Sequence, residues 1–353
     1  MLIETPHIIQ KSDPVLVTGA GGFIGSRVVN GLLKLDFEHI RCFVRSAQSA
    51  RRIESLAKDG SFSSRIEIVT GNLLSPGDCV RAAKGAKVIF HLAAGRGEKS
   101  YPDAFMNSVV TTRNLLDSAD RDLRRFVNVS SFSVYSNRNK RRGRVLDESC
   151  EIEQAPAQRG EAYCFAKVEQ EQIVREWGSK YGIPYTIVRP GQVYGAGNEG
   201  ITGRVGIGTF GVFLHLGGGN RIPLTHVENC ADAIILAGIL PGADGEIFNV
   251  VDDNLPTSRY FLHLYKKKVR RFRSIYVPHI ASYALCFLWE KYSKWSGDQL
   301  PPVFNRKRWH CYWKQTVFSN EKLKKQLGWS PRVSISDGLT QFFESCRARK
   351  ANA

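Results

Sequence analysis

The first 190 residues alternate short apolar runs with longer amphipathic stretches. Each run of four to six residues is rich in β-branched or aromatic side chains and ends at a turn signal. The expected strands are 15–18, 40–44, 66–70, 88–93, 126–130 and 184–189. Helical candidates such as 23–33, 105–118 and 161–181 lie between them and are long enough to cross over a sheet. This alternation predicts an α/β fold with a doubly wound parallel sheet.

After Pro190 the pattern loosens into glycine-rich connections over 191–219, a helical candidate at 228–240 and a strand candidate at 246–251. A last helix is expected at 319–327, with a glycine stop and a proline just beyond. We therefore expect a dinucleotide-binding domain over 12–190 and a smaller, mainly substrate-binding domain over 191–353. Elements within about 224–251 are expected to return to the sheet.

A glycine-rich loop, Thr18-Gly19-Ala20-Gly21-Gly22-Phe23-Ile24-Gly25, joins the first strand to the first helix. Gly19 permits a tight turn, Gly22 lets the backbone approach a pyrophosphate, and Gly25 allows the helix to pack closely. The free amides of the helix N-terminus favour the same anion. A glycine pattern in this context predicts a Rossmann-type dinucleotide site rather than a merely structural turn.

The end of the second strand indicates which dinucleotide binds. An acid at this place normally accepts the ribose 2′-hydroxyl of NAD, but here the strand runs into Arg45 and Ser46. A guanidinium matches phosphate oxygens, so Arg45 can hold the 2′-phosphate of NADP, with Arg51 or Arg52. We expect NADP in preference to NAD; the alternative is a solvated arginine at a strand end.

Candidate catalytic groups lie in the second half of the same domain. Tyr163 and Lys167 are four residues apart in a helical stretch, so they share one face, and a nearby ammonium favours the phenolate form of tyrosine. The segment that contains Ser131 follows the fifth expected strand, at the edge where such sheets bind ligands. Ser131 can donate to a substrate oxygen; the alternative is a serine that completes a turn.

Taken together, these motifs resemble the extended short-chain dehydrogenase/reductase family, in its NAD-dependent epimerase/dehydratase branch. Further family-like segments are Gly71-Asn72-Leu73, His91-Leu92-Ala93-Ala94, Val188-Arg189-Pro190 through Tyr194-Gly195, and 226–233. The resemblance implies Tyr163 as general acid/base, Lys167 as the group that holds the nicotinamide ribose, and Ser131 as the substrate anchor. The cofactor-binding residues that it implies are Gly19, Gly22, Phe23, Ile24, Gly25, Arg45, Asn72, Leu73, Leu92, Ala93, Ala94, Tyr163, Lys167, Pro190 and Val193.

The chain departs from the family pattern at three places that bear on its reaction and its ligands. Sugar dehydratases of this family carry an Asp-Glu pair after the serine or threonine, where this chain has Phe132 and Ser133. Asn72 replaces the usual aspartate, which keeps an acceptor for the adenine amine but loses the charge. Arg221 lies five residues before His226, whereas sugar epimerases often have an arginine four before.

The expected substrate is a secondary alcohol or ketone, foremost on a nucleotide sugar, and both an epimerase and a reductase stay open. One alternative is a membrane-associated dehydrogenase similar to the 3β-hydroxysteroid and sterol branch, which carries an apolar segment at a similar place. A second alternative, from a different class, is a non-catalytic dinucleotide-binding regulator. An intact set of Ser131, Tyr163 and Lys167 argues against that class.

The net charge of +17 in 353 residues is concentrated in two segments, residues 138–144 and residues 258–308. Residues 138–144 contain five cations and no acid, and as a loop they either overhang the site and attract an anionic substrate or are simply solvated. The segment 266–295 joins cations to the apolar stretch 280–289. That stretch is interpreted either as a core helix of the small domain or as a peripheral contact with an anionic membrane surface.

Composition excludes other classes of protein. The apolar content of 42% excludes a disordered chain, and no apolar stretch approaches the roughly 20 residues of a membrane span. The eight cysteines show no zinc spacing, so reduced thiols and no metal site are expected. Neither basic segment resembles a nucleic-acid reader. We expect a cytoplasmic enzyme, with a homodimer by analogy to the family and an anionic small molecule as substrate.

Overall fold

A computed structural model describes residues 6–58, 63–95, 100–139, 141–198, 200–209, 211–297 and 304–351. Seven parallel strands form the main sheet in the order β3-β2-β1-β4-β5-β7-β12. They are β1 (Val15–Thr18), β2 (Ile40–Val44), β3 (Ile66–Thr70), β4 (Val88–His91), β5 (Arg125–Val129), β7 (Tyr185–Pro190) and β12 (Ile247–Val250). The order reverses between β1 and β4, which confirms the predicted doubly wound sheet and places a crevice at that point.

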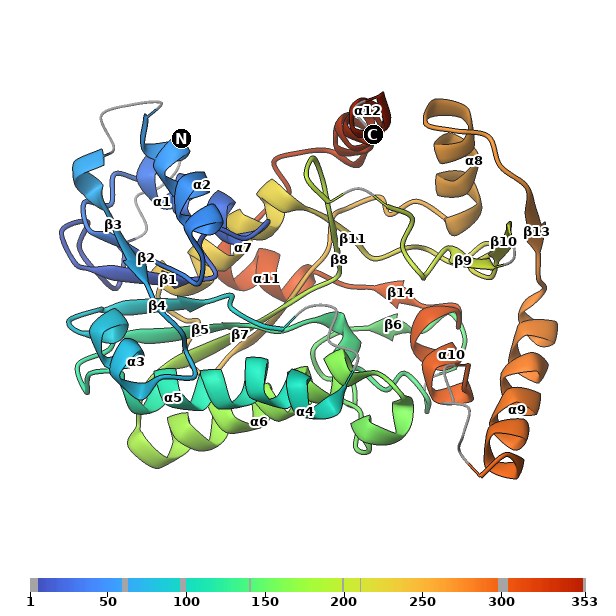
Figure 1. Cartoon of the computed structure of the whole chain (residues 1–353), viewed down its shortest axis with the longest axis horizontal. Helices are drawn as coiled ribbons and strands as arrows, with labels where there is room; N and C mark the ends of the chain where they lie inside the picture. Colours follow the sequence, from blue (N-terminus) through green and yellow to red (C-terminus); the bar gives the residue numbers. More distant parts are fainter. Residues whose placement is uncertain are drawn as a thin grey trace.

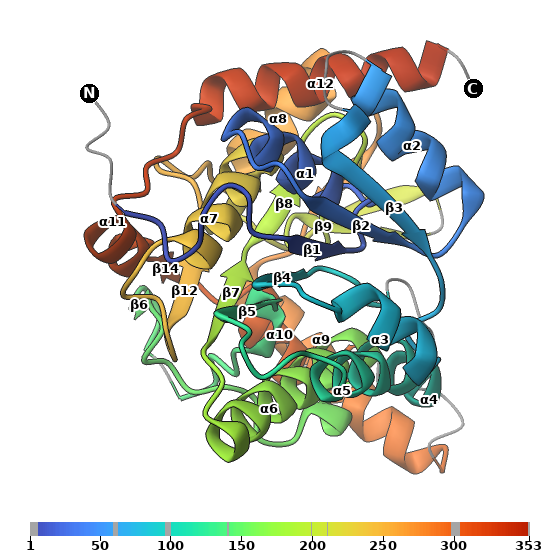
Figure 2. The same cartoon turned by 90° about the vertical axis from the view of Figure 1, so that its left-hand side faces the viewer.

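Helices cover both faces of the sheet, as Figure 2 shows. On one face lie α1 (Gly25–Lys34), α2 (Ala47–Lys58), α7 (Val227–Ile239) and α11 (Glu321–Leu327). On the other lie α3 (Pro76–Ala83), α5 (Thr111–Asp117) and α6 (Ala162–Tyr181). The strands alternate their apolar side chains between these two cores: Val15 and Val17 pack toward α1, whereas Leu16 packs toward the opposite face.

Most predicted elements are present, with ends shifted by one or two residues. The expected helix 105–118 is interrupted: α4 (Tyr101–Ala104) and a π-helical stretch, Phe105–Val110, precede α5. Hydroxyls compete with the helical ladder there, since Thr112 Oγ1 donates to the carbonyl of Ser108 at 2.6 Å. The fourth strand ends at His91, because residues 92–95 leave the sheet and line a cavity instead.

The chain after Pro190 contributes to the sheet and builds a second part beside it (Figure 1). β12 pairs with β7, and α7 packs on the sheet. The second part contains β9 (Gly206–Thr209), β10 (Val212–His215), α8 (Ser258–Lys268), β13 (Ser274–Tyr276), α9 (His279–Trp295), α10 (Arg306–Tyr312) and α12 (Ile335–Ala351). Short pairs join β8 (Gln192–Tyr194) to β11 (Leu224–His226) and β6 (Val145–Leu146) to β14 (Val317–Phe318).

The apolar segment 280–289 forms most of α9, but the expectation of a core helix is wrong. The residues of α9 that are fully buried are the small ones Ser282, Cys286 and Ser293. Ile280 is 84% exposed and Trp295 is 81% exposed. The apolar side chains therefore point outward, because the inner face of α9 rests on α10 through residues that permit close approach. None of the described helices is long and apolar enough to cross a bilayer.

Candidate active site

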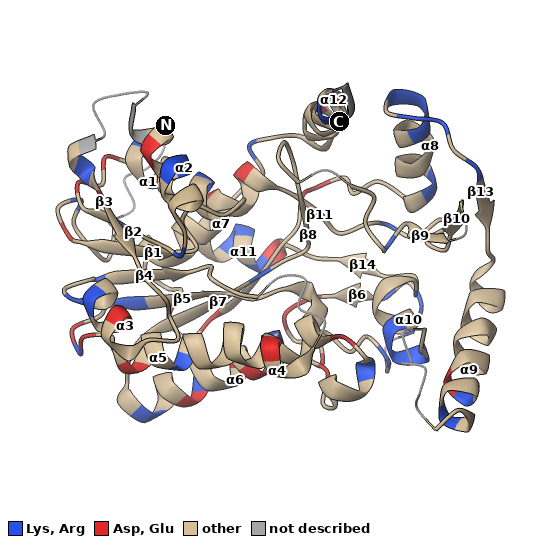
Figure 3. Ribbon diagram, viewed as in Figure 1, with Lys and Arg blue, Asp and Glu red and all other residues tan. Residues whose placement is uncertain are grey.

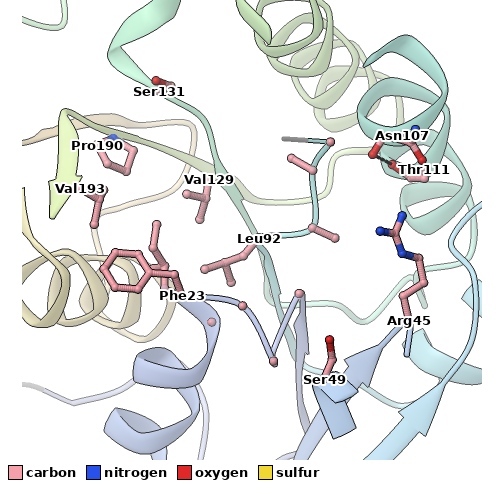
Figure 4. A pocket seen from close by; sticks show the side chains of 18 of the residues that line it. Phe23, Arg45, Ser49, Leu92, Asn107, Thr111, Val129, Ser131, Pro190 and Val193 are labelled. Carbon is pink, nitrogen blue, oxygen red and sulfur yellow. Dashed lines mark hydrogen bonds between the residues drawn. The ribbon is translucent and has the colours of Figure 1, made fainter. Parts of the chain in front are cut away.

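A cavity of about 730 Å³ opens at the carboxyl ends of the sheet strands, at the point where the strand order reverses. Its lining comes from the glycine loop, the ends of β2 and β4, and the segments after β5 and β7 (Figure 4). Of the candidate residues named from the sequence, all those from Gly19 to Val193 line this one cavity except Arg51, so Arg52 is the second arginine beside Arg45. The described lining includes Arg45, Arg52 and Lys167 but neither Asp nor Glu, so its charge favours an anionic ligand.

The glycine loop has the shape that a dinucleotide pyrophosphate requires. Gly19 has φ +67°, a conformation that residues with a side chain rarely adopt. A Cβ added to Gly19 would also lie only 3.0 Å from the Ala93 nitrogen, so both the backbone conformation and the close contact favour glycine. A Cβ on Gly25 would lie 2.1 Å from the Gly19 carbonyl, so this glycine permits contact between helix and loop rather than between helix and strand. At Gly22 the nearest atom to such a Cβ is the Gly19 oxygen at 3.0 Å. The first amides of α1 follow directly, which fits an anion.

The adenosine end of the cavity combines a guanidinium with hydroxyl and amide groups. Arg45 is exposed at the end of β2 and lines the cavity, and Ser49 and Arg52 from α2 lie beside it. Arg52 donates to the carbonyl oxygen of Gly21 at 3.3 Å, which joins α2 to the glycine loop. Asn72 lines the cavity as expected, but its side-chain oxygen accepts from the Leu74 amide at 3.0 Å and so is partly engaged.

Tyr163 and Lys167 lie in the first turns of α6, on the face that borders the cavity. The Tyr163 side chain is 39% exposed, whereas Lys167 is buried. The Lys167 ammonium lies 5.9 Å from the centroid of the Tyr163 ring. Ser131 follows β5 and also lines the cavity; its hydroxyl accepts from the Ser133 amide at 3.1 Å, which fixes its direction. A phenol, an ammonium and a hydroxyl therefore border the same space.

The ammonium of Lys167 is held by groups inside the fold. Its nitrogen donates to the carbonyl oxygen of Val129 at 2.7 Å and to the side-chain oxygen of Gln170 at 2.8 Å. Both acceptors are buried or nearly so, and both are neutral. These two hydrogen bonds stabilise the ammonium, and neither of the two acceptors carries a charge that opposes the effect of the ammonium on Tyr163.

A buried chain of hydrogen bonds continues from Gln170 toward the glycine loop. The Gln170 amide donates to Thr112 Oγ1 at 2.7 Å, and Thr112 donates its own proton to the Ser108 carbonyl. Thr112 must then accept from Nε2 of His91 at 2.8 Å, so Nε2 carries the proton. Nδ1 of His91 accepts from the Thr18 hydroxyl at 2.9 Å. Thr18 directly precedes Gly19, so the chain links the lysine to the coenzyme loop.

This arrangement requires a neutral imidazole. Burial, and then the positive charge of Lys167, lower the pKa of His91 to about 3. A protonated ring would have to donate from Nδ1 as well, and it would reverse the Thr18 hydrogen bond. His91 is thus a fixed structural connector across the working pH range.

A buried ion pair fixes α6 against the strand that ends at the cavity. Glu171 accepts from Arg189 at 2.8 Å and 2.5 Å, and both side chains are 1% exposed. Burial alone would raise the pKa of Glu171, but the hydrogen bonds and charge of Arg189 hold it below its usual value. Because Glu171 lies one turn after Lys167 and Arg189 precedes Pro190, the pair joins α6 to the segment after β7 that lines the cavity.

Several lining residues were not singled out from the sequence. They are Ser49, Asn107, Thr111, Gln192, Asn198 and Tyr312. Tyr312 comes from α10, close to three guanidiniums, and no local motif marks it. Conversely, Phe132 is buried against Phe318 and offers no acid or base. In the basic loop, the described cations Arg138, Arg141, Arg142 and Arg144 are exposed and none lines the cavity; Lys140 lies outside the described residues.

Comparisons with known proteins agree with this geometry. The family model described as "NAD dependent epimerase/dehydratase family" matches residues 15–250. Cinnamoyl-CoA reductase 1 from Oryza sativa subsp. japonica is 33% identical over 184 residues, which cover 51% of this chain and 53% of that protein. The chain thus spans about half of the length of this curated relative.

Other similarities extend over nearly the whole chain. 3beta-Hydroxysteroid-dehydrogenase/decarboxylase isoform 1 from Arabidopsis thaliana is 23% identical over 367 residues, which cover 95% of this chain and 80% of that protein. The crystal structure of UDP-glucuronic acid 4-epimerase from Bacillus cereus in complex with NAD has a TM-score of 0.69. It is 20% identical and covers 95% of this chain and 99% of that chain, a likeness that shows the shared fold.

Proposed function

The chain belongs to the NAD-dependent epimerase/dehydratase family and is an enzyme of the extended short-chain dehydrogenase/reductase type, and on this premise we propose that it transfers hydride at a secondary alcohol or ketone with Ser131, Tyr163 and Lys167 as its catalytic set. The observation that carries the proposal is that these three side chains border the same cavity as the glycine loop. Phe132 and Ser133 supply no acid-base pair, so the proposal does not include dehydration.

Each of the three residues has a distinct part. Tyr163 takes a proton from the substrate alcohol in oxidation and returns it to the ketone in reduction. The Lys167 ammonium stabilises the phenolate and, with Val129 and Gln170 fixing its position, donates toward the ribose side of the cavity. Ser131 donates to the substrate oxygen, where negative charge develops. A bound nicotinamide supplies the hydride acceptor or donor.

The coenzyme in this proposal is NADP, with NAD as the alternative. The supporting observation is local: the adenosine end offers Arg45, Arg52 and Ser49 to a phosphate, and the described lining has no carboxylate to accept a ribose 2′-hydroxyl. The glycines Gly19, Gly22 and Gly25, with Phe23 and Ile24, would surround the pyrophosphate. Asn72 and Leu73 would contact the adenine. Leu92, Ala93, Ala94, Pro190 and Val193 would border the nicotinamide half.

The substrate in the leading form of the proposal is a nucleotide sugar. Support comes from the cations of the cavity, whose described lining has no Asp or Glu, and from the similarity in fold to an epimerase of a UDP-linked sugar. The proposed arrangement places the coenzyme on residues 12–190 and the substrate mainly on 191–353, in an enzyme that works as a homodimer.

A screen of nucleotide sugars with NADPH or NADP tests this function. Steady consumption of NADPH indicates a reductase, whereas turnover without net change of coenzyme indicates an epimerase. If no nucleotide sugar binds saturably or turns over, the sugar-nucleotide form of the proposal fails.

A dehydrogenase for a sterol-like alcohol is the second candidate. It is favoured by one specific observation, the relative that acts on 3β-hydroxysteroids and aligns with 95% of this chain. The same screen with 3β-hydroxysterols and NADP or NAD decides between the two, because the two substrate classes differ in charge and size. If the enzyme oxidises a sterol and acts on no sugar nucleotide, the sterol-like alcohol replaces the nucleotide sugar as the proposed substrate.

A further inference from the structure

The outer surface of α9 is apolar, although it faces solvent. Ile280, Leu285, Leu288 and Trp295 are 84%, 57%, 60% and 81% exposed, and the neighbouring Ile275 is 58% exposed. Apolar residues at 281, 284, 285, 288, 292 and 295 recur with the three- and four-residue spacing of one helix face. Exposed apolar side chains that gather in one stripe differ from the scattered ones that any surface carries.

The opposite face of α9 explains why the stripe faces outward. Ser282, Cys286 and Ser293 are the buried residues, and they let α9 approach the rest of the second part closely. The Trp309 indole donates to the Ser282 hydroxyl at 2.9 Å, which fixes the rotation of α9 about its axis. Tyr283 adds an edge contact with the Trp309 ring at 5.0 Å between centroids. The outward orientation of the stripe is therefore built into the fold.

Cations flank this stripe at both ends. Lys267, Lys268, Arg270, Arg271 and Arg273 are exposed at the end of α8 and in the stretch that leads to β13. Lys291 and Lys294 are exposed in the last turns of α9. Figures 1 and 3 show α8, β13 and α9 along one edge of the molecule, opposite β3, with blue near its two ends and none on the first turns of α9.

We propose that this surface, formed by the exposed side chains of 266–295 and here called the α9 edge, binds the face of a lipid bilayer that contains anionic lipids. A helix of 17 residues is about 25 Å long and can lie in the plane of the interface, with its apolar stripe among the acyl chains. Flanking cations then meet the anionic head groups, which attract them. Trp295 and Tyr292 have the amphipathic rings that favour this interface.

The charge of the α9 edge argues against a second copy of the chain as the occupant. Residues 258–297 carry nine Lys or Arg and one acid, Glu290, which pairs with Arg306. A two-fold contact through this face would bring like charges together, because each copy presents the same patch to the other. A nucleic acid would leave the apolar stripe in water. A bilayer satisfies both the apolar stripe and the cations.

Vesicle co-sedimentation of the full chain tests the proposal, with phosphatidylcholine vesicles that contain or lack phosphatidylserine. The triple variant Ile280→Gln/Leu288→Gln/Trp295→Gln removes the stripe at exposed positions. A matched control, Val80→Gln/Tyr181→Gln/Val317→Gln, removes exposed apolar side chains from other surfaces. We expect the unaltered chain to bind the anionic vesicles, the control to bind equally, and the stripe variant to bind roughly tenfold or more weakly.

Three outcomes would overturn the proposal. They are no binding of the unaltered chain to anionic vesicles, equal binding of the stripe variant, and a stripe-dependent dimer in analytical ultracentrifugation without vesicle binding, which would assign the face to a second copy. Circular dichroism shows that each variant is folded, and calorimetric titration with NADPH measures coenzyme binding. Because coenzyme binding and vesicle binding are measured separately, failure of one leaves the other proposal standing.

Discussion

Nζ of Lys167 donates to the side-chain oxygen of Gln170, one turn later on α6, at 2.8 Å. Gln170 is fully buried, so this neutral acceptor positions the ammonium without cancelling its charge. The same amide continues through Thr112 and His91 to Thr18, where the coenzyme loop begins. In the proposed function Gln170 is thus a positioning residue, which would act on catalysis through Lys167.

Replacing this amide by a carboxylate tests the positioning role. Gln170→Glu keeps the shape but places a negative charge beside Lys167, so it offsets the effect of the ammonium on the Tyr163 phenol. We expect kcat for alcohol oxidation to fall by about 10- to 100-fold, and the acidic limb of the pH–rate profile to move to higher pH. A merely structural role would lower stability without moving the profile. Gln172→Glu on the exposed face of α6 is the control.

The Arg45→Ala variant tests whether the cavity prefers NADPH to NADH. Loss of the guanidinium removes a charge-assisted contact with the 2′-phosphate, so affinity for NADPH should fall by roughly 10- to 100-fold while affinity for NADH changes little. Calorimetric titration of both coenzymes measures this ratio. Arg51→Ala is a suitable control, since Arg51 is exposed on α2 but does not line the cavity. Equal losses for both coenzymes would remove the argument for NADP.

Substitutions at two glycines distinguish a position where only glycine fits from one where alanine is accommodated. A Cβ on Gly25 would meet the Gly19 carbonyl at 2.1 Å, so Gly25→Ala should displace the loop, destabilise the fold by about 1–3 kcal/mol and abolish tight coenzyme binding. Gly77→Ala in α3 meets nothing closer than the Ser75 hydroxyl at 3.9 Å and should be neutral or stabilising. Urea unfolding and coenzyme titration of both variants check the contrast.

Acid lability should follow from the buried histidines. Burial, and then Lys167, lower the pKa of His91 to about 3, and burial, and then Arg259, lower that of His215 to about 4. Between the ordinary value of 6.5 and these values the unfolded chain binds more protons than the folded one, so stability falls as pH falls. Each group contributes a slope of at most about 1.4 kcal/mol per pH unit. Urea unfolding from pH 7 to 4.5 should show less slope for His91→Gln.

Periodicity was sufficient to predict the sheet, and the motifs predicted many of the residues that line the cavity. Each strand expected in the first 190 residues pairs in the sheet, because central strands such as β1 and β4 are buried on both faces and are therefore largely apolar. Glycine positions and the spacing of Tyr163 and Lys167 carry geometric demands that can be recognised in the sequence. Residues such as Tyr312 could not be found in this way, since α10 meets the cavity only through tertiary packing.

The orientation of α9 is a second feature that could not be predicted from the sequence. Its apolar composition left open whether it packs in the core or contacts a membrane surface, and its small residues Ser282, Cys286 and Ser293 give no sign of being the inner face. Packing of α9 on α10 decides which side is covered. The π-helical stretch before α5 escapes prediction for a similar reason: it depends on where the hydroxyls of Thr111 and Thr112 find acceptors.

Single-turnover hydride transfer with Tyr163→Phe, followed through the absorbance of the nicotinamide, is the most direct test of the central claim that a phenol activated by Lys167 moves the proton in this cavity. Phenylalanine keeps the ring and loses only the hydroxyl. We predict that the transfer rate falls by about 10²- to 10⁴-fold while the affinity for NADPH stays within about twofold of that of the unaltered enzyme. A variant that transfers hydride at the original rate would contradict the account.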